Sequence, residues 1–185
     1  SAIKISNSIY KNEYDINRTS INMDGDTQKP LDIFSDKTLL NSLNIPEVSG
    51  YCSEEQDGII NLNEKGKFLV ISDPLDGSSN IESNVTIGTI FSIIPTNGFK
   101  NEQAIFQKGN KQASSGFFVY GPRTTLFLTF KDGTHSFFFD DNKKLFQLMH
   151  KNILISKNTS EYSINSSYKR FWHKKVLTYI ENCQK

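Results

Sequence analysis

The stretch VISDPLDGSSNIESNVTIGTIF, residues 70–91, joins two runs typical of β-strands through an acidic turn. Its first part continues GKFLVIS (66–72), and a short, nearly continuous apolar run of this kind predicts a buried strand. Its second part, VTIGTIFSII (85–94), is rich in β-branched residues and predicts another strand. Between the two runs stand Asp73 and Asp76. Two carboxylates at the end of a buried strand indicate a polar site rather than simple packing.

The local chemistry of this turn favours a hard metal ion. Pro74 disfavours helical geometry at Asp73, so that residue should be extended, and the chain should turn sharply at Gly77. Asp73 and Asp76 can then point into one pocket with the carbonyl oxygen of Leu75 between them. Mg²⁺ prefers oxygen ligands of this kind and often shares its shell with phosphate. The turn therefore predicts a divalent cation next to a phosphorylated ligand.

The residues that follow the acidic pair can face an anion. The hydroxyls of Ser78 and Ser79 and the amides around Gly77 form the type of concave turn that binds phosphate. A bare Asp-Gly pair is more often an ordinary surface turn. The full octet DPLDGSSN, residues 73–80, is much more specific than that pair.

The rest of the chain predicts an α+β fold with a layered arrangement of sheet and helices. Residues 30–43 have helical spacing and a proline suited to the first turn, and residues 168–183 also predict a helix. Lys131-Asp132-Gly133 is a hairpin signal. Short apolar and aromatic runs predict an antiparallel meander at 115–121, 124–130, 135–140 and 144–149. We expect a mixed, largely antiparallel sheet with flanking helices over 29–185, preceded by an irregular N-terminal arm at 1–28.

Composition excludes several classes of partner. The 185 residues include 21 basic and 20 acidic side chains, a formal net charge of +1, which argues against a nucleic-acid binder. No stretch approaches the roughly 18 consecutive apolar residues of a membrane span. The two cysteines, Cys52 and Cys183, give neither a disulfide framework nor a metal-binding spacing, so we expect a reducing, cytoplasmic location.

Two other acidic spots are ambiguous when taken alone. The adjacent pair Glu54-Glu55 in SGYCSEEQDG is most often a solvated loop. Asp26 reads as a turn residue, and Asp32 as an acidic residue in the first turn of a helix, where the helix dipole favours it.

Together these segments resemble class I fructose-1,6-bisphosphatases. DPLDGSSNIESNVTIGTIF is similar to the metal-site signature of that family. GDTQKPLDIFSDKTL (25–39), SEE (53–55), GFFVYGPRTTLFLTF (116–130) and YSINSSY (162–168) are similar to further segments of it, so the resemblance runs from about residue 22 to the end. Inositol monophosphatase-like enzymes share D-P-[LI]-D-G but typically continue with threonine. Sedoheptulose bisphosphatases also have D-P-L-D-G-S-S, whereas Asn80-Ile81 together with IGTIF favours the fructose bisphosphatase group.

The resemblance implies Mg²⁺-dependent hydrolysis of the 1-phosphate of fructose 1,6-bisphosphate, with Mn²⁺ as a possible substitute. It implies main metal ligands at Glu54, Asp73, Asp76 and the Leu75 carbonyl, with Asp26 at a further metal position. It implies an acid/base pair at Asp32 and Glu55. It implies phosphoryl contacts at Gly77, Ser78 and Ser79, 6-phosphate contacts at Asn165 and Tyr168, and an AMP-effector pair at Lys67-Phe68.

The chain also departs from the family pattern, because it resembles only the N-terminal, metal-site domain. Family members are much longer, form homotetramers, and complete the sugar site with a C-terminal domain that we expect to be absent here. We therefore expect slow turnover of fructose 1,6-bisphosphate by this chain. Three alternatives remain open: a sedoheptulose-1,7-bisphosphatase, a catalytically inactive relative that keeps a metal site, and a structural domain without chemistry.

Overall fold

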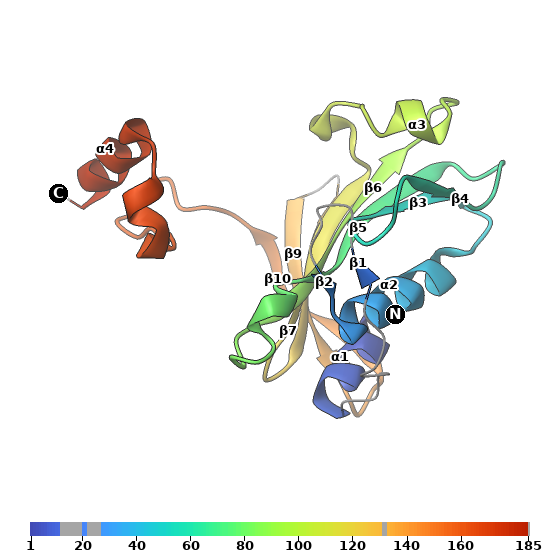
Figure 1. Ribbon diagram of the computed structural model, residues 1–185, viewed down its shortest axis with the longest axis horizontal. Helices are drawn as coiled ribbons and strands as arrows, with labels where there is room; N and C mark the ends of the chain where they lie inside the picture. The colour runs from blue at the N-terminus through green and yellow to red at the C-terminus, as the bar shows by residue number, and fades with distance from the viewer. Residues whose placement is uncertain (12–19, 22–26, 131–132, 185) are drawn as a thin grey trace. The chain divides into compact units, whose positions relative to one another are not determined.

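The computed structural model describes residues 1–11, 20–21, 27–130 and 133–184. They fall into two compact units, Ser1–Ile153 and Leu154–Lys185, and each is described by itself. The first unit contains a mixed sheet with flanking helices, which confirms the predicted α+β fold (Figure 1). The division after Ile153 differs from the expectation of one domain over 29–185.

The large sheet has eight strands in the order β10-β9-β8-β7-β6-β5-β3-β4. Neighbouring strands are antiparallel, except that β3 and β5 run parallel. The bounds are β3 Val48–Ser53, β4 Ile59–Asn61, β5 Phe68–Asp76, β6 Ile87–Pro95, β7 Ser114–Tyr120, β8 Thr124–Phe130, β9 Gly133–Asp140 and β10 Leu145–Ile153. A separate pair, β1 (Ser20–Ile21) and β2 (Thr27–Gln28), is antiparallel. The predicted mixed and largely antiparallel sheet is therefore confirmed.

The parallel pair arises from the placement of β4. This short strand folds back along the outer edge of β3, and the chain then returns to the other side of β3 to form β5. Parallel neighbours end at the same edge of a sheet. The residues that follow β3 and those at the end of β5 are thereby brought together.

Helix α2 (Pro30–Leu43) covers the sheet at β3 and β5, and a second helix packs against it. Helix α2 has the predicted bounds and packs on β5, β3 and the N-terminal helix α1 (Ala2–Lys11) (Figure 1). Leu31 is 1% exposed, and its burial fixes the first turn of α2 against the core. The buried apolar core consists of Ala2, Ile5, Leu31, Leu39, Val48, Tyr51, Val70, Leu75, Ile87 and Tyr120.

Helix α1 corrects the prediction of an irregular arm at 1–28, which is wrong for residues 2–11. Residues 1–28 as a whole are polar and rich in asparagine and serine, and this composition masks the helical spacing of the short segment 2–11. Ile5 is fully buried, and the Ser6 hydroxyl lies 2.7 Å from that of Thr124 on β8. Tertiary packing therefore stabilises a helix that intrinsic propensity leaves marginal.

The meander is confirmed as β7 to β10. Phe130 pairs with Gly133 across the predicted β8–β9 hairpin, while Lys131 and Asp132 lie outside the described residues. Phe117 and Phe127 stack across β7 and β8, with ring centroids 4.9 Å apart. Cross-strand aromatic pairs of this kind help to fix the register of antiparallel strands.

The second unit contains a 3-10 helix, Ser166–Phe171, followed by α4, Lys174–Cys183. The predicted helix at 168–183 is thus divided at Trp172 and His173. The Nδ1 atom of His173 accepts a hydrogen bond from the amide of Lys175 at 3.3 Å and caps α4. The packing of this helix on the sheet stays a prediction. Among the described residues, no helix is long and apolar enough to cross a membrane.

Candidate active site

Two acidic residues stand side by side where the parallel strands β3 and β5 meet the same edge. Ser53 and Ser72 are the last paired residues of this ladder, and Glu54 and Asp73 follow them directly. The amide of Glu54 donates a hydrogen bond to the carbonyl oxygen of Ser72 at 3.1 Å and extends the pairing by one residue. The backbone therefore fixes both acidic residues in neighbouring positions.

A β-bulge brings the second aspartate of the motif to the same face of the sheet. Side chains alternate along a strand, so Asp73 and Asp76, three residues apart, would ordinarily point to opposite faces. Here Pro74 and Leu75 together oppose the single residue Thr89 on β6. The β6 residues that pair with the two aspartates are therefore two residues apart, and this even spacing puts both aspartates on the same face. The Thr89 hydroxyl donates to the carbonyl oxygen of Pro74 at 2.8 Å and holds the bulge.

Gly77 reverses the chain immediately after the bulge. Its φ of 77° lies in the left-handed region that favours glycine, and a Cβ atom there would lie 3.2 Å from the side-chain nitrogen of Asn80. A 3-10 turn, Ser78–Asn80, follows. The carbonyl oxygen of Ser78 accepts a hydrogen bond from the Nζ atom of Lys29 at 3.2 Å, which ties this turn to the start of α2.

Asp32 occupies the first turn of α2, close to Ser78. Its Oδ2 atom accepts a hydrogen bond from the amide of Lys29 at 2.7 Å, and the residue is only 3% exposed. Among the described residues, its Oδ1 atom is buried without a hydrogen-bond partner. Burial raises the pKa of Asp32, and nearby Glu54 adds to this, while the Lys29 amide and the Ser78 hydroxyl oppose it.

Among these acidic residues, Asp73 has the most strongly raised pKa. Burial, followed by the negative charge of Glu54, raises its pKa from 3.8 to about 7, and Asp76 adds a smaller effect. The amide of Leu75 donates a hydrogen bond to the carboxylate at 3.0 Å and opposes the change. Near neutral pH this carboxyl group is thus balanced between its acidic and its ionised form.

The acidic residues at this edge offer oxygen donors of the kind that Mg²⁺ and Mn²⁺ bind. No three His, Cys, Asp or Glu side chains of the described residues are grouped closely enough to form a ready cation cage. The available donors are nevertheless carboxylates and backbone carbonyls, which are the oxygen ligands that these ions prefer. A cation would offset the repulsion between Glu54 and Asp73 and could use the unpartnered Oδ1 atom of Asp32. In donor chemistry and charge, the residues fit such an ion.

The structure brings Asp32, Glu54, Asp73 and Ser78 together and places Leu75, Asp76, Gly77 and Ser79 next to them along the chain. Glu55 is partly buried, and its amide donates to the Ser53 hydroxyl at 3.2 Å. Asp26, predicted as a further metal ligand, lies outside the described residues.

Other predicted site residues belong to other elements of the chain. Asn165 and Tyr168 belong to the second unit, where the Asn165 side chain accepts hydrogen bonds from the amide and hydroxyl of Ser167. Lys67 and Phe68 lie at the opposite end of β5 from Asp73. Their role as an effector pair therefore concerns a place distinct from the carboxylates.

Lys29 is a site residue that the sequence did not single out. Its amide binds Asp32, its ammonium group binds the Ser78 carbonyl, and the same group lies 3.8 Å from Glu82. The available signal was its place three residues before Asp32, at the position that caps a helix beginning with Pro30.

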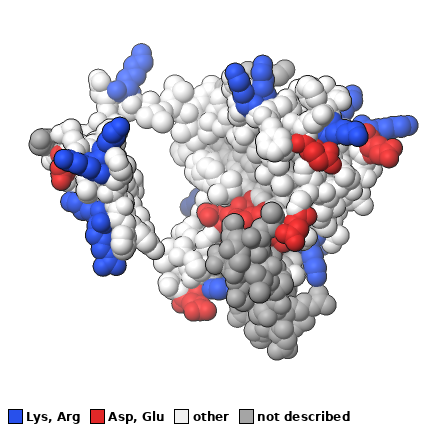
Figure 2. Space-filling view, turned by 45° about the horizontal axis from the view of Figure 1, so that its top comes forward, with Lys and Arg blue, Asp and Glu red and all other residues white. Residues whose placement is uncertain are grey.

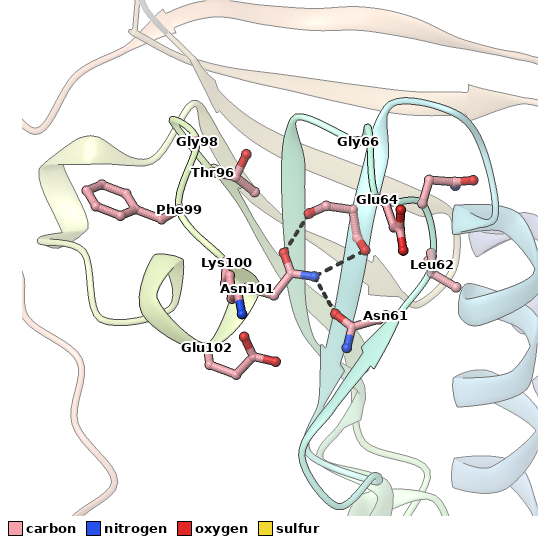
Figure 3. A pocket seen from close by; sticks show the side chains of 12 residues that line it. Asn61, Leu62, Glu64, Gly66, Thr96, Gly98, Phe99, Lys100, Asn101 and Glu102 are labelled. Carbon is pink, nitrogen blue, oxygen red and sulfur yellow. Dashed lines mark hydrogen bonds between the residues drawn. The ribbon is translucent and has the colours of Figure 1, made fainter.

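A separate cavity of about 500 Å³ lies at the other end of β3 (Figure 3). There the Nδ2 atom of Asn101 donates to the Ser49 carbonyl at 3.1 Å and to the Asn61 side chain at 2.7 Å. The Ser49 hydroxyl donates to the Oδ1 atom of Asn101 at 2.7 Å. The polar atoms of Asn101 are thus paired within the protein. These hydrogen bonds connect α3 (Asn101–Ala104) to the sheet and have a structural role.

Surface charge is mixed on the face viewed in Figure 2. The Lys and Arg side chains of the described residues form separate groups there, with acidic side chains among them, and they do not merge into one basic patch on this face. This distribution is in keeping with the formal net charge of +1.

Comparisons with known proteins agree with the geometry. Residues 5–151 match the family model described as "Fructose-1-6-bisphosphatase, N-terminal domain". The chain is 42% identical over 162 residues to a class 1 fructose-1,6-bisphosphatase of Acinetobacter baumannii, covering 86% of this chain and 50% of that protein. It is also 42% identical over 161 residues to the class 1 enzyme of Shewanella frigidimarina, covering 86% of this chain and 49% of that protein.

A solved structure shows the same similarity. The crystal structure of Leishmania major fructose-1,6-bisphosphatase in holo form superposes with a TM-score of 0.85 at 30% identity, covering 97% of this chain and 59% of that one. The chain spans about half the length of the curated relatives it matches.

Proposed function

This chain belongs to the fructose-1,6-bisphosphatase family, and we propose that it forms the metal-ion half of a phosphatase site that hydrolyses the 1-phosphate of fructose 1,6-bisphosphate. The products are fructose 6-phosphate and phosphate, and the cofactor is Mg²⁺ or Mn²⁺. Such a reaction belongs to carbohydrate metabolism, in the direction of gluconeogenesis, in the cytoplasm. The complete assembly is a homo-oligomer.

The convergence of carboxylates at the ends of β3 and β5 carries this proposal. Glu54 and Asp73 lie side by side, burial and then the charge of Glu54 raise the pKa of Asp73 to about 7, and Glu54 adds to the burial that raises the pKa of Asp32. Crowded like charges cost stability unless a cation or a proton joins them. Strongly perturbed carboxyl groups are enriched at catalytic sites, and phosphoryl transfer uses cations to neutralise the charge on the phosphoryl oxygens.

Different residues of this chain would have different roles in the hydrolysis. A bound divalent cation would offset charge on the phosphoryl oxygens and lower the pKa of bound water. Glu54, Asp73, Asp76 and the Leu75 carbonyl would hold the cation. Asp32, whose pKa is raised by burial, would accept a proton from the attacking water together with Glu55. Gly77, Ser78 and Ser79 would bind the phosphoryl oxygens.

The binding of the rest of the substrate is proposed from a chain that spans about half the length of its curated relatives. Asn165 and Tyr168 would bind the 6-phosphate, while the matched relatives are about twice as long as the match. Substrate positioning can be worth about 7–11 kcal/mol. Losing a third of this, roughly 3 kcal/mol, slows turnover more than a hundredfold at about 1.4 kcal/mol per decade. We therefore expect slow turnover by the chain alone.

Phosphate release from fructose 1,6-bisphosphate in excess Mg²⁺ tests the proposed reaction. The expected result is slow, chelator-sensitive release, with fructose 6-phosphate as the sugar product in phosphorus NMR. The matched control is Asp73→Asn, which keeps the hydrogen bond from Leu75 but removes the charge.

Three outcomes have different meanings in this assay. Release that is equal in the wild type and in Asp73→Asn would contradict the proposed site. Fructose 1-phosphate as the product would contradict the assigned regiochemistry. Turnover near 10 per second, a typical enzyme value, would show that a C-terminal half contributes little.

A further inference from the structure

A buried hydrogen-bond network lies directly behind the candidate active site. The Tyr51 hydroxyl donates to the Oδ1 atom of Asp36 at 3.0 Å and lies 2.9 Å from the Ser72 hydroxyl. The side-chain amide of Gln56 donates to the other oxygen of Asp36. Tyr51 and Asp36 are 0% and 1% exposed, so the centre of the network is shielded from water, while Gln56 at its edge is partly buried.

The donor and the acceptor can be assigned for each hydrogen bond of the network. The phenol has a single proton, which it gives to Asp36, so the Ser72 hydroxyl must donate to the Tyr51 oxygen. Gln56 can donate to Asp36 through its amide nitrogen only. Two donors, Tyr51 and Gln56, thus occupy the two oxygens of the Asp36 carboxylate, and Ser72 in turn donates to Tyr51.

Every member of this network is close in sequence to a residue of the candidate active site. Asp36 lies one helical turn after Asp32 on α2, and Ser72 immediately precedes Asp73 on β5. Tyr51 lies on β3 three residues before Glu54, and Gln56 directly follows Glu55. The network therefore joins the helix, the two parallel strands and the acidic loop from which the carboxylates project.

We propose that Asp36, Tyr51 and Gln56 are positioning residues that hold Glu54 and Glu55 in register with Asp32 and Asp73. This inference rests on the proposed function, because it assigns the network a role toward the same cation and water. The Glu54-Glu55 loop is anchored on one side by the Glu54 amide bond to Ser72, and Gln56 anchors it on the other side through Asp36.

Packing alone does not account for such a network. A buried carboxylate is costly unless each oxygen is paired, and an apolar side chain at this place on α2 would avoid that cost. Fully satisfied buried networks contribute geometric specificity, and partners behind metal-binding carboxylates orient those ligands. Loss of such partners typically weakens metal binding or activity by about 10–100-fold.

The test uses Gln56→Leu and Tyr51→Phe in the full chain, with Ser49→Ala as the matched control. Ser49 lies on the same strand and makes buried hydrogen bonds to Asn101 and to the Phe68 carbonyl, but at the opposite end from Glu54. Two measurements are made on each variant: amide hydrogen exchange at Glu54 and Gln56, and calorimetric titration with Mn²⁺ alone.

The expected result is exchange at least tenfold faster at the Glu54 and Gln56 amides in Gln56→Leu and Tyr51→Phe, with Mn²⁺ affinity reduced by about tenfold or more. Ser49→Ala should leave both readouts at wild-type values. Unchanged exchange at both amides would overturn the inference. Faster exchange with unchanged Mn²⁺ affinity would also overturn it, because the network would then be structural only.

The two measurements separate this inference from the proposed function. If the wild-type chain takes up no Mn²⁺, the proposed metal site fails. Exchange still decides whether the network orders the acidic loop, since it is recorded without metal. If the wild type binds Mn²⁺ and all variants bind it equally, the metal site survives and the positioning role is refuted.

Discussion

Replacing Asp73 by Asn should stabilise the metal-free protein while it removes metal binding. The negative charge of Asp73 is unfavourable in the folded state, because burial and the neighbouring Glu54 raise its pKa from 3.8 to about 7. Asparagine has nearly the same shape, and its Oδ1 atom can still accept the hydrogen bond from Leu75. The substitution therefore removes the repulsion and preserves the local geometry.

The size of the effect follows from the pKa difference. A change from 3.8 to about 7 corresponds to roughly 4 kcal/mol at about 1.4 kcal/mol per pKa unit. Asp73 is half-buried, and solvent screening reduces this to about 1–2 kcal/mol. For a chain of 185 residues, each kcal/mol raises Tm by about 2–4 °C, so we expect Asp73→Asn to melt about 2–8 °C higher.

The stability difference between the wild type and Asp73→Asn should depend on pH. Below pH 3.8 the carboxyl is protonated in both states, so the wild type and Asp73→Asn should melt together. Between pH 3.8 and about 7 the folded chain retains a proton that the unfolded chain releases, so wild-type stability falls as pH rises. The full difference should therefore be present at pH 8.

Thermal unfolding followed by circular dichroism, in chelator at pH 8 and near pH 4, measures this difference. Added Mn²⁺ should then raise Tm for the wild type and not for Asp73→Asn, because only a ligand that binds the folded state stabilises it. An Asp73→Asn protein that melts lower than the wild type at pH 8 would refute the electrostatic argument.

Three further predictions concern stability and metal affinity. Leu31→Ala should cost about 2–5 kcal/mol in chemical denaturation, because Leu31 is 1% exposed; a cost below 1 kcal/mol would contradict its place in the core. Gly77→Ala should cost about 1–2 kcal/mol in the same assay, since φ is 77°, and an unchanged midpoint would argue against the left-handed turn. Mn²⁺ affinity in calorimetry should rise from pH 5 to pH 8 as Asp73 loses its proton, and a flat profile would exclude Asp73 as a ligand.

Local patterns were enough to predict the elements whose signals are contained in one segment. Helix α2 has the predicted bounds because Pro30 and the apolar spacing act within a single stretch. The meander followed from short apolar runs separated by turn residues. Helix α1 was missed, because its burial depends on β8 and the core, and a segment rich in serine shows little of this.

The sequence names the candidate site residues, whose roles stay a prediction, but it does not show how the paired strands bring them together. The sequence placed the turn at Gly77, whereas the common face of Asp73 and Asp76 depends on a bulge opposite Thr89. A bulge is a property of two paired strands, so one strand's sequence does not contain it. The same reason explains why the contacts between Asp36 and Tyr51, 15 residues apart, were not foreseen.

Paramagnetic broadening of the amide signals by Mn²⁺ tests the central claim most directly. If the ends of β3 and β5 form one cation site, substoichiometric Mn²⁺ should first broaden the amides of Glu54, Asp73 and residues 75–79 in the wild type. The same titration of an Asp73→Asn, Asp76→Asn variant should leave these signals sharp. Broadening that begins instead at the acidic pair Asp140-Asp141, or that persists in the variant, would contradict the proposed site.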